Sequence, residues 1–393
     1  MSYASTLAPT PARILPAIVF SQFAGTSLWF AGNAVLPELQ ASLGLRQEAL
    51  GWLTSSVQLG FILGTLCFAF FSLADRVSPR LLFLLCALLG AVANALVLFS
   101  ATSITGVLLL RGATGFLLAG VYPVGMKIAA GWYSGRLGKA IGYLVGALVL
   151  GTAFPHLLRG LGAGLPWQTM LLAVSLLAAA GGLLMYLLVP DGPYLTKGAR
   201  FEVNNMLRVF RGRELRAAAF GYFGHMWELY TLWAFVPLIL AYAFPGWQPA
   251  QVSVYSFMVI AAGAVGCILG GYLSRRWGSE RVAFVQLLLS GLCCVASVWV
   301  LQMPPLLLPF LLFWGVVVAG DSPQFSALTA RAAPPQLVGT ALTVVTSIGF
   351  AITIISIQLT GYLLTVIPVQ WVFILLAIGP LAGLLSMRPL LRK

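Results

Sequence analysis

The stretch from Leu81 to Ser100 reads LLFLLCALLGAVANALVLFS, and it decides the kind of fold. A helix that crosses the hydrocarbon core of a membrane needs about 20 mostly apolar residues, and all its backbone amides are bonded within the segment. A strand of a membrane barrel would instead alternate apolar and polar residues over about 10 positions. Because this stretch is apolar on all sides, it predicts a membrane-spanning α-helix.

Composition extends this prediction to the whole chain. Of the 393 residues, 60% are hydrophobic and 8% are charged, whereas about 25% are charged in an ordinary soluble domain. The five cysteines fall inside apolar runs, so they are interpreted as small core residues, and we expect no disulfide, metal site or cofactor. These cysteines are Cys67, Cys86, Cys267, Cys293 and Cys294. The first apolar run, 14–36, exceeds the roughly 7 to 15 residues of a signal-peptide core and is predicted to span the membrane.

The spacing of the apolar runs predicts two similar halves. The first six runs lie near 14–36, 50–73, 80–101, 104–131, 138–162 and 167–189. Six more lie near 215–242, 251–274, 281–302, 305–330, 337–362 and 369–387, each about 200 residues after its counterpart. We therefore predict an all-α membrane protein of twelve transmembrane helices, in two six-helix bundles related by a pseudo-two-fold axis. Residues 1–190 and 214–393 would form the bundles, joined by a cytoplasmic linker at 191–213.

The basic residues predict the orientation of the chain. With a cytoplasmic N-terminus, 18 of the 22 basic residues fall in inside segments: Arg13, Arg76, Arg80, Arg136, Lys139, Lys197, Arg200, Arg208, Arg211, Arg213, Arg216, Arg275, Arg276, Arg281, Arg331, Arg388, Arg392 and Lys393. Of the outside loops, only the one holding Arg46 is basic. The positive-inside rule therefore favours an inner membrane protein with both termini in the cytoplasm. The net charge of +13 then requires no nucleic acid as a partner.

One loop motif resembles a known family. Residues 71–80 read FSLADRVSPR and are similar to the signature G-x-L-A-D-R-x-G-R-R of the major facilitator superfamily, with Phe71 and Ser78 in place of the glycines. The matching loop of the second half, GYLSRRWG at 271–278, keeps both glycines but has Arg275 in place of the acid. Residues 111–115, RGATG, resemble the R-x-x-x-G element of the same family. Gly142, Gly146, Gly151 and Pro155 resemble its glycine-proline stretch.

The resemblance implies a transporter that works as a monomer by alternating access, in which the two halves rock about a site at the membrane midplane. It also suggests that Asp75, with Arg76 and Arg80, acts in gating. A carboxylate at a helix end can bind backbone amides or an arginine and hold one conformation by about 0.3 to 2 kcal/mol. The alternative is a solvated turn residue.

Seven ionisable residues fall inside the predicted spans: Arg111, Lys127, His156, Arg159, His225, Glu228 and Asp321. A charge at this depth costs about 2.5 to 3.5 kcal/mol or more, so each should face the bundle interior, water or a partner. In the family that the chain resembles, helices one, four, seven and ten line the central cavity. Five of the seven lie on helices four, seven and ten.

Helix one carries a polar and aromatic stripe at helical spacing: Gln22, Thr26, Trp29 and Asn33. This stripe is typical of a wet cavity wall, although the same residues also form bonds between membrane helices. On helix four, Arg111 and Tyr122 share one face. Lys127 falls nearly opposite and can snorkel to the surface. His156 and Arg159 could ring the outward mouth.

Helices seven and ten carry the acidic candidates. Helix seven carries Tyr222, His225, Trp227, Glu228 and Tyr230. His225 and Glu228 are about one turn apart, and Glu228 could load and release a proton as its surroundings change. The alternative is a static hydrogen bond between the two. On helix ten, Pro323 interrupts the backbone hydrogen bonds beside Asp321 and Gln324. An acid beside a broken helix is typical of a transport site. The alternative is an Asp321 paired with an arginine across the bundle.

The charges divide between the halves, basic in the first and acidic in the second. In one hypothesis, the opposite charges pair and separate as the halves rock, and so act as gates. In the other, the basic residues bind an anionic substrate while an acid carries the coupling proton. We adopt the second hypothesis, with Arg111 as the anion contact and Glu228 or Asp321 as the proton carrier. The predicted substrate-binding residues are Arg111, Tyr122, Asn33, Trp29, Gln22, Trp227 and Gln324. The predicted proton-coupling residues are Glu228, Asp321 and His225.

Three other classes of function compete with an anion transporter. Proton-coupled efflux of drugs or cations is the strongest, because 12% of the residues are aromatic and Trp29, Trp227 and Trp233 could line a cavity for apolar cations. A membrane enzyme is disfavoured because no H-E-x-x-H, G-x-S-x-G or G-x-x-x-x-G-K motif occurs. A sensor would need a soluble domain, and the longest polar segment is short. The partners are thus expected to be a small solute, protons and lipid.

Overall fold

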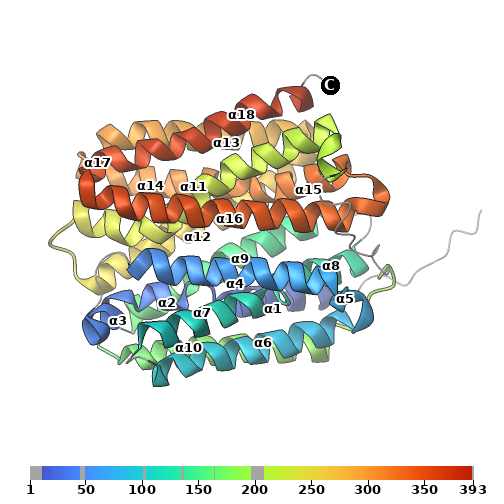
Figure 1. Ribbon diagram of the computed structural model, residues 1–393, viewed down its shortest axis with the longest axis horizontal. Helices are drawn as coiled ribbons and strands as arrows, with labels where there is room; N and C mark the ends of the chain where they lie inside the picture. Colours follow the sequence, from blue (N-terminus) through green and yellow to red (C-terminus); the bar gives the residue numbers. More distant parts are fainter. Residues whose placement is uncertain are drawn as a thin grey trace, which may run out of the picture.

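The computed structural model describes residues 11–44, 49–100, 103–133, 137–162, 164–195 and 208–391. In these ranges every regular element is helical (Figure 1). Eleven of these helices are long and apolar enough to cross a membrane, and a shorter apolar helix, α1 (Ile14–Thr26), precedes them. The prediction of an all-α membrane fold with twelve spans is confirmed. Part of the linker, and Arg46, Arg136, Lys197, Arg200, Arg392 and Lys393, lie outside the described residues.

The first six spans run from α1 to α10. After α1 come α2 (Ala31–Ala34), α3 (Leu36–Leu43), α4 (Ala49–Phe70), α5 (Leu73–Arg76), α6 (Pro79–Leu96), α7 (Ile104–Leu118), α8 (Tyr122–Trp132), α9 (Leu137–Leu161) and α10 (Trp167–Leu188). The second six are α11 (Arg213–Ala243), α12 (Pro249–Trp277), α13 (Ser279–Val300), α14 (Pro304–Gly320), α15 (Ser322–Ala332), α16 (Val338–Val366), α17 (Val369–Val372) and α18 (Ile378–Leu391). Short 3₁₀ turns lie at 97–99, 208–211, 335–337 and 373–377.

One end of the helix bundle is rich in arginine. The first turn of α6 carries Arg80, and the last turns of α12, α15 and α18 carry Arg276, Arg331 and Arg388. We call it the basic end; it holds α5, α8 and α15, at the right of Figure 1. The opposite end holds α3 and α17.

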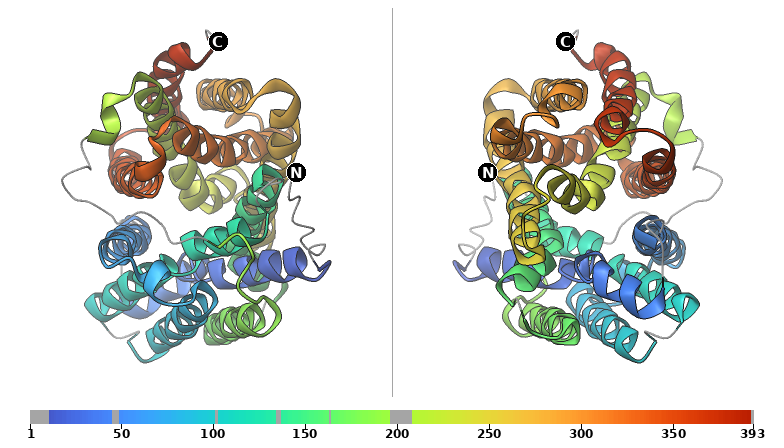
Figure 2. Two further views of the ribbon diagram at one scale, coloured as in Figure 1. Left: turned by 90° about the vertical axis from the view of Figure 1, so that its right-hand side faces the viewer. Right: turned by 90° about the vertical axis from the view of Figure 1, so that its left-hand side faces the viewer.

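The two sets of six spans form separate bundles that meet along two pairs of helices (Figures 1 and 2). The first pair, α9 and α12, packs along most of its length, from Gly142 against Cys267 to Gly160 against Ala250. The second pair, α4 and α16, is tied near the opposite end, where Nε2 of Gln358 donates to Oγ of Ser55 over 2.9 Å. The bundles therefore touch without exchanging helices, although the predicted boundaries at 190 and 214 stay a prediction.

Small residues set the closest helix crossing inside the first bundle. A methyl group added at Gly60 of α4 would lie 1.9 Å from the carbonyl oxygen of Gly112, and one at Gly115 of α7 would lie 2.0 Å from that of Val57. Membrane helices gain stability mainly from such close packing, because lipid offers no hydrophobic driving force between them. The pair α4 and α7 thus depends on glycine on both sides of the contact.

Three of the predicted spans, 14–36, 104–131 and 305–330, contain a break; the sequence predicted the one beside Pro323 in the third of these, but not the other two. The first span breaks at residues 27–30, between α1 and α2; the fourth at 119–121, between α7 and α8; the tenth at Asp321, between α14 and α15. Pro123 and Pro323 occupy the first turns of α8 and α15, where the missing amide hydrogen costs least. Apolar run length alone did not reveal these breaks, because the breaking residues are themselves mostly apolar.

Gly60→Ala should destabilise the protein by about 1 to 3 kcal/mol, because the new methyl group would push α4 away from α7. The measurement is thermal unfolding of the purified protein in detergent. Gly339→Ala is the matched control, because Gly339 lies in α16 with no atom within 4 Å of the added carbon. Equal melting temperatures for the two variants would contradict the packing argument.

Candidate functional site

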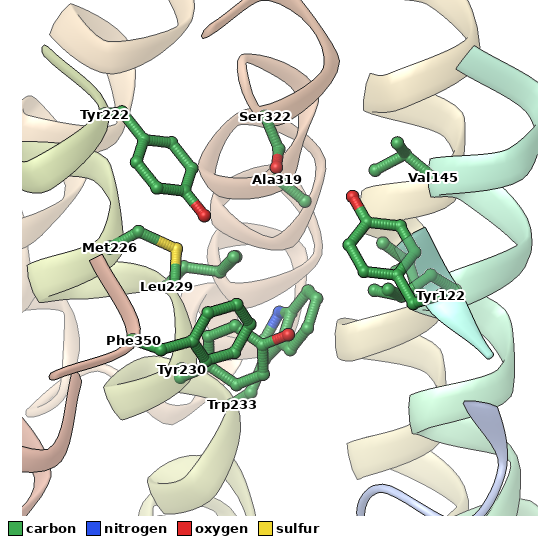
Figure 3. A pocket seen from close by; sticks show the side chains of 12 residues that line it. Tyr122, Val145, Tyr222, Met226, Leu229, Tyr230, Trp233, Ala319, Ser322 and Phe350 are labelled. Atoms are coloured by element: carbon green, nitrogen blue, oxygen red, sulfur yellow. The ribbon is translucent and has the colours of Figure 1, made fainter. Parts of the chain in front are cut away.

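A small cavity lies between the two bundles at mid-depth (Figure 3). Its polar lining comes from Tyr122 at the start of α8, Tyr222 on α11 and Ser322 at the start of α15. The rest of the wall is apolar or aromatic: Val145, Leu148, Val149, Met226, Leu229, Tyr230, Trp233, Ala319 and Phe350. Its volume is about 20 Å³, the space of about one water molecule. The bundles must therefore separate before a solute can enter.

Two half-helices, one from each bundle, begin at this cavity. Tyr122 is the first residue of α8 and Ser322 is the first residue of α15, and a proline follows each of them. The N-terminus of a helix carries a partial positive charge and favours negative groups. The residue before α15 is the acid Asp321, whereas the residue before α8 is Val121. The N-terminus of α8 thus has no acidic side chain in its first turn.

Behind the cavity wall, His225 and Asp321 form a buried pair between α11 and α15. Nδ1 of His225 lies 2.8 Å from Oδ1 of Asp321, and both side chains are 1% exposed. Asp321 directly precedes Ser322, and His225 directly precedes Met226, so both belong to chain segments that line the cavity. The alternative that Asp321 pairs with an arginine is wrong, because its partner is a histidine. Protonation of either group would change the charge next to the cavity.

Glu228 lies deeper inside the second bundle. Its Oε1 accepts hydrogen bonds from Oγ of Ser290 on α13 and from Nε1 of Trp314 on α14, both over 2.5 Å. The side chain is fully buried, and its partners come from the same bundle. Within the part of the chain that the structure describes, Glu228 thus bonds to neither His225 nor a residue of the first bundle, and the alternative of a static His225–Glu228 bond is wrong.

Arg111 occupies the corresponding place inside the first bundle. Its guanidinium donates to Oδ1 of Asn94 over 2.9 Å and to the carbonyl oxygens of Leu28 and Trp29 over 2.9 and 2.5 Å. The side chain is 1% exposed. These carbonyls belong to the break between α1 and α2, so Arg111 supplies the donors that the interrupted helix lacks.

An aromatic cluster lies between the bundles beside the cavity. Its members are Trp29, Phe30 and Phe61 of the first bundle and Tyr230, Trp233 and Phe350 of the second. Across the boundary, ring centroids are 4.5 Å apart for Phe61 and Phe350, 5.5 Å for Trp29 and Phe350, and 5.7 Å for Trp29 and Tyr230. Such pairs contribute about 0.5 to 1.5 kcal/mol each beyond the burial of their area. The cluster holds the two bundles together without any charge.

Two of the predicted gating residues contact the first bundle and the start of the linker. Asp75 forms an ion pair with Lys127 of α8, whose Nζ also donates to the carbonyl of Ala74 over 2.8 Å. Arg76 is exposed. Arg80 lies 3.9 Å from Asp191 and over the ring of Tyr186. The acid of the loop motif thus binds a lysine, where an arginine or backbone amides were expected.

The remaining predicted substrate residues are dispersed. Asn33 donates to Oγ1 of Thr54 over 2.7 Å, and Gln22 is buried against Gly125 of α8. Trp227 packs against Gly379 of α18, and Gln324 is buried in the first turn of α15. Of the predicted substrate residues, Tyr122 lines the cavity and Trp29 belongs to the aromatic cluster, three of whose members also line it. The α9 residues of the wall were not predicted, because they are ordinary apolar residues of an apolar helix.

Comparison with known proteins agrees with this architecture. Residues 218–392 match the family model described as Major Facilitator Superfamily. A galacturonate transporter of Dickeya chrysanthemi is 27% identical over 195 residues, which is 44% of this chain and 56% of that protein. The match thus covers little more than half of that relative.

Solved structures share the fold over nearly the whole chain. The human organic anion transporter MFSD10 superposes with a TM-score of 0.78 at 17% identity, covering 97% of this chain and all of that one. A bacterial homologue of the human lysosomal transporter Spinster, in an inward-facing and unoccupied conformation, gives 0.74 at 15% identity, with 98% of both chains covered. At these identities the likeness concerns the fold.

Arg111→Lys should destabilise the protein by about 1 to 3 kcal/mol, because an ammonium group cannot replace the fork that binds two carbonyls and Asn94 together. Thermal unfolding in detergent measures the effect. Arg331→Lys is the control, because Arg331 is largely exposed and pairs with Glu280 at the basic end, where a change of about 0 to 1 kcal/mol is expected. If both variants melt alike, Arg111 does not support the break in the first span.

Proposed function

We propose that this chain is a transporter of the major facilitator superfamily, and that it moves a small organic anion together with protons by alternating access. The observation that carries the proposal is the His225–Asp321 pair beside a cavity at which two half-helices begin. We further propose that the protein acts as a monomer in the inner membrane. The basic end then faces the cytoplasm, as the positive-inside rule requires.

The N-terminus of α8 supports an anion as the solute. Discontinuous helices in transporters direct their positive ends at anionic groups of the substrate. The first turn of α8 contains no acid, and the hydroxyl groups of Tyr122 and Tyr222 point toward the space between the bundles (Figure 3). Hydroxyl groups next to a positive helix end can bind a carboxylate that also carries hydroxyl groups. The galacturonate transporter that shares 27% identity makes a sugar acid the first solute to test.

Asp321 is the better candidate for the proton carrier of the two acids considered. It lies at the start of α15, adjacent to Ser322 in the cavity wall, and faces a histidine that can itself gain or lose a proton. Glu228 also directly precedes a lining residue, Leu229, but its Oε1 is already bonded to Ser290 and Trp314 of the same bundle. We therefore assign coupling to Asp321 with His225, and a packing role to Glu228.

The structure also changes the role proposed for Arg111. Its donors bind Asn94 and the carbonyls of the broken first span, so an anion would have to compete with these partners. We assign the anion contact to the start of α8 and to Tyr122. Arg111 then acts indirectly, by fixing the position of Trp29.

Efflux of apolar cations is the second candidate function. The aromatic cluster favours it, because the faces of tryptophan and tyrosine rings attract cations. In the structure these rings contact one another across the bundles, which fits closure of the path as well as binding. Uptake assays with both solute types decide between the two functions.

Asp321→Asn should lower proton-driven uptake at least about tenfold, while exchange of labelled for unlabelled solute without a gradient stays within about threefold of the native rate. The reason is that asparagine cannot release a proton but leaves the path intact. The measurement uses proteoliposomes with labelled D-galacturonate, other sugar acids and tetraphenylphosphonium, with and without an imposed proton gradient. Glu228→Gln is the matched control and should keep its dependence on the gradient.

The outcomes test separately the solute, the residue that couples protons, and proton coupling itself. Transport of the phosphonium cation alone would replace the anion by the second candidate function. Gradient-driven uptake that survives Asp321→Asn but is lost in Glu228→Gln would move the coupling role to Glu228. Uptake of a sugar acid without any response to the gradient would remove proton coupling altogether.

Asp75→Asn and Lys127→Gln should each slow transport, because each leaves a half-buried charge without its partner near the basic end. The double variant should be less impaired than the sum of the two, with a coupling of about 0.5 to 3 kcal/mol in the activation free energy. Initial rates in proteoliposomes, normalised to the amount of reconstituted protein, give this value. Additive effects would show that the ion pair does not act as a unit.

A further inference from the structure

One face of α9 continues from the cavity toward the opposite end of the molecule. Val145 and Val149 line the cavity, and the positions that continue their face at helical spacing are Thr152, His156 and Arg159. The flanking faces of α9 are used differently: Gly142 and Gly160 pack on α12, and Gly151 packs on α1. The polar row therefore extends along the boundary between the bundles, beyond the aromatic cluster.

Two members of the row are buried with polar atoms that lack a partner. Thr152 is fully buried and His156 is 2% exposed. Among the described residues, nothing forms a hydrogen bond to Oγ1 of Thr152 or Nε2 of His156. A buried polar group without a partner costs about 1 to 3 kcal/mol. Two such groups on one helix face suggest that a ligand binds them in another state of the protein.

Arg159, the third member, is held by an acid. It forms an ion pair with Glu38 of α3, and both side chains are about one-fifth exposed, at 21% and 22%. This pair lies at the end of α9 that faces away from the basic end. A carboxylate arriving from that side could take the place of Glu38 on the guanidinium.

The cover over the row is the part of the first bundle that closes the path. The short helix α2 packs against α9, and it directly follows Trp29 and Phe30 of the aromatic cluster. If the rings of the two bundles move apart toward the end that holds α3 and α17, α9 becomes accessible beside them. The polar row is then the first group of donors that an entering solute meets.

We propose that Thr152, His156 and Arg159 form a second anion subsite in the outer half of the path, separate from the start of α8. Its ligand is a small carboxylate or a similar anion, which exchanges with Glu38 for Arg159 and bonds to His156 and Thr152. The inference rests on the proposed function for the direction of the path. Its test, however, needs no knowledge of the transported solute.

The test is thiol labelling of Thr152→Cys from the outer face of intact cells. The probes are two membrane-impermeant methanethiosulfonates, one with an anionic sulfonate and one with a cationic trimethylammonium group. The anionic reagent should react at least about tenfold faster, which corresponds to about 1.4 kcal/mol. Adding His156→Gln or Arg159→Gln should reduce this preference to less than about threefold.

Two controls accompany the measurement. The native chain, with Cys86, Cys267, Cys293 and Cys294 buried and Cys67 only partly exposed, gives the background rate. Phe154→Cys gives a matched position on the opposite face of α9, where Phe154 packs against Phe23, and should not exceed this background. Both controls should react slowly with each of the two reagents.

The outcomes distinguish the subsite from the proposed function. Background labelling of Thr152→Cys, or equal rates with both reagents, would overturn the subsite. A preference for the anionic reagent that survives Arg159→Gln and His156→Gln would overturn it as well. Failure of every sugar acid in the uptake assay, together with an intact labelling preference, would count against the proposed solute while supporting the subsite.

Discussion

The hydrocarbon core of a membrane offers no hydrogen-bond partner to a backbone carbonyl, and the break in the first span is built around this constraint. The first span is interrupted at residues 27–30, which frees carbonyl oxygens in a buried position. Nη2 of Arg111 donates to two of them, from Leu28 and Trp29, and its Nη1 donates to Oδ1 of Asn94. One side chain of the fourth span therefore fixes where the first span bends. Since Trp29 lies at that bend, Arg111 also positions the aromatic cluster that closes the path.

The second bundle holds a buried charged residue of the opposite sign where its own equivalent spans meet. Glu228 of the seventh span accepts bonds from Trp314 of the tenth and Ser290 of the ninth. In the first bundle, Arg111 connects the first, third and fourth spans, which correspond to the seventh, ninth and tenth. An arginine donates and so compensates carbonyls of a broken helix, whereas a carboxylate accepts from side chains and leaves the backbone of its own helix intact. The two arrangements match the backbones they contact: the first span is broken at the carbonyls that Arg111 binds, and α11 continues from Arg213 to Ala243.

The sequence predicted the number and spacing of the spans because lipid requires long apolar segments, whatever their neighbours. It did not predict the partners of the buried charges. His225 and Glu228 are close along α11 but point to different neighbours, α15 and α13 with α14. Lys127 was placed opposite the Arg111 face on the assumption of a continuous fourth helix, and the break at 119–121 resets the direction in which α8 presents its side chains. Lys127 therefore reaches Asp75, a contact that spacing along one helix cannot predict.

The contacts between the bundles indicate which side can open with least cost. Along α9 and α12, small residues such as Gly146 and Ala264 bring the backbones together over most of the helix length. Near the opposite end, α4 and α16 are joined by the neutral bond between Ser55 and Gln358, which contributes about 1 kcal/mol. Ring contacts of about 0.5 to 1.5 kcal/mol each supply most of the rest. No ion pair between the bundles occurs among the described residues. Separating α4 from α16 while α9 and α12 stay together therefore breaks no ion pair of the described residues. The two halves can then move about the closed cavity without leaving an unpaired charge in the membrane.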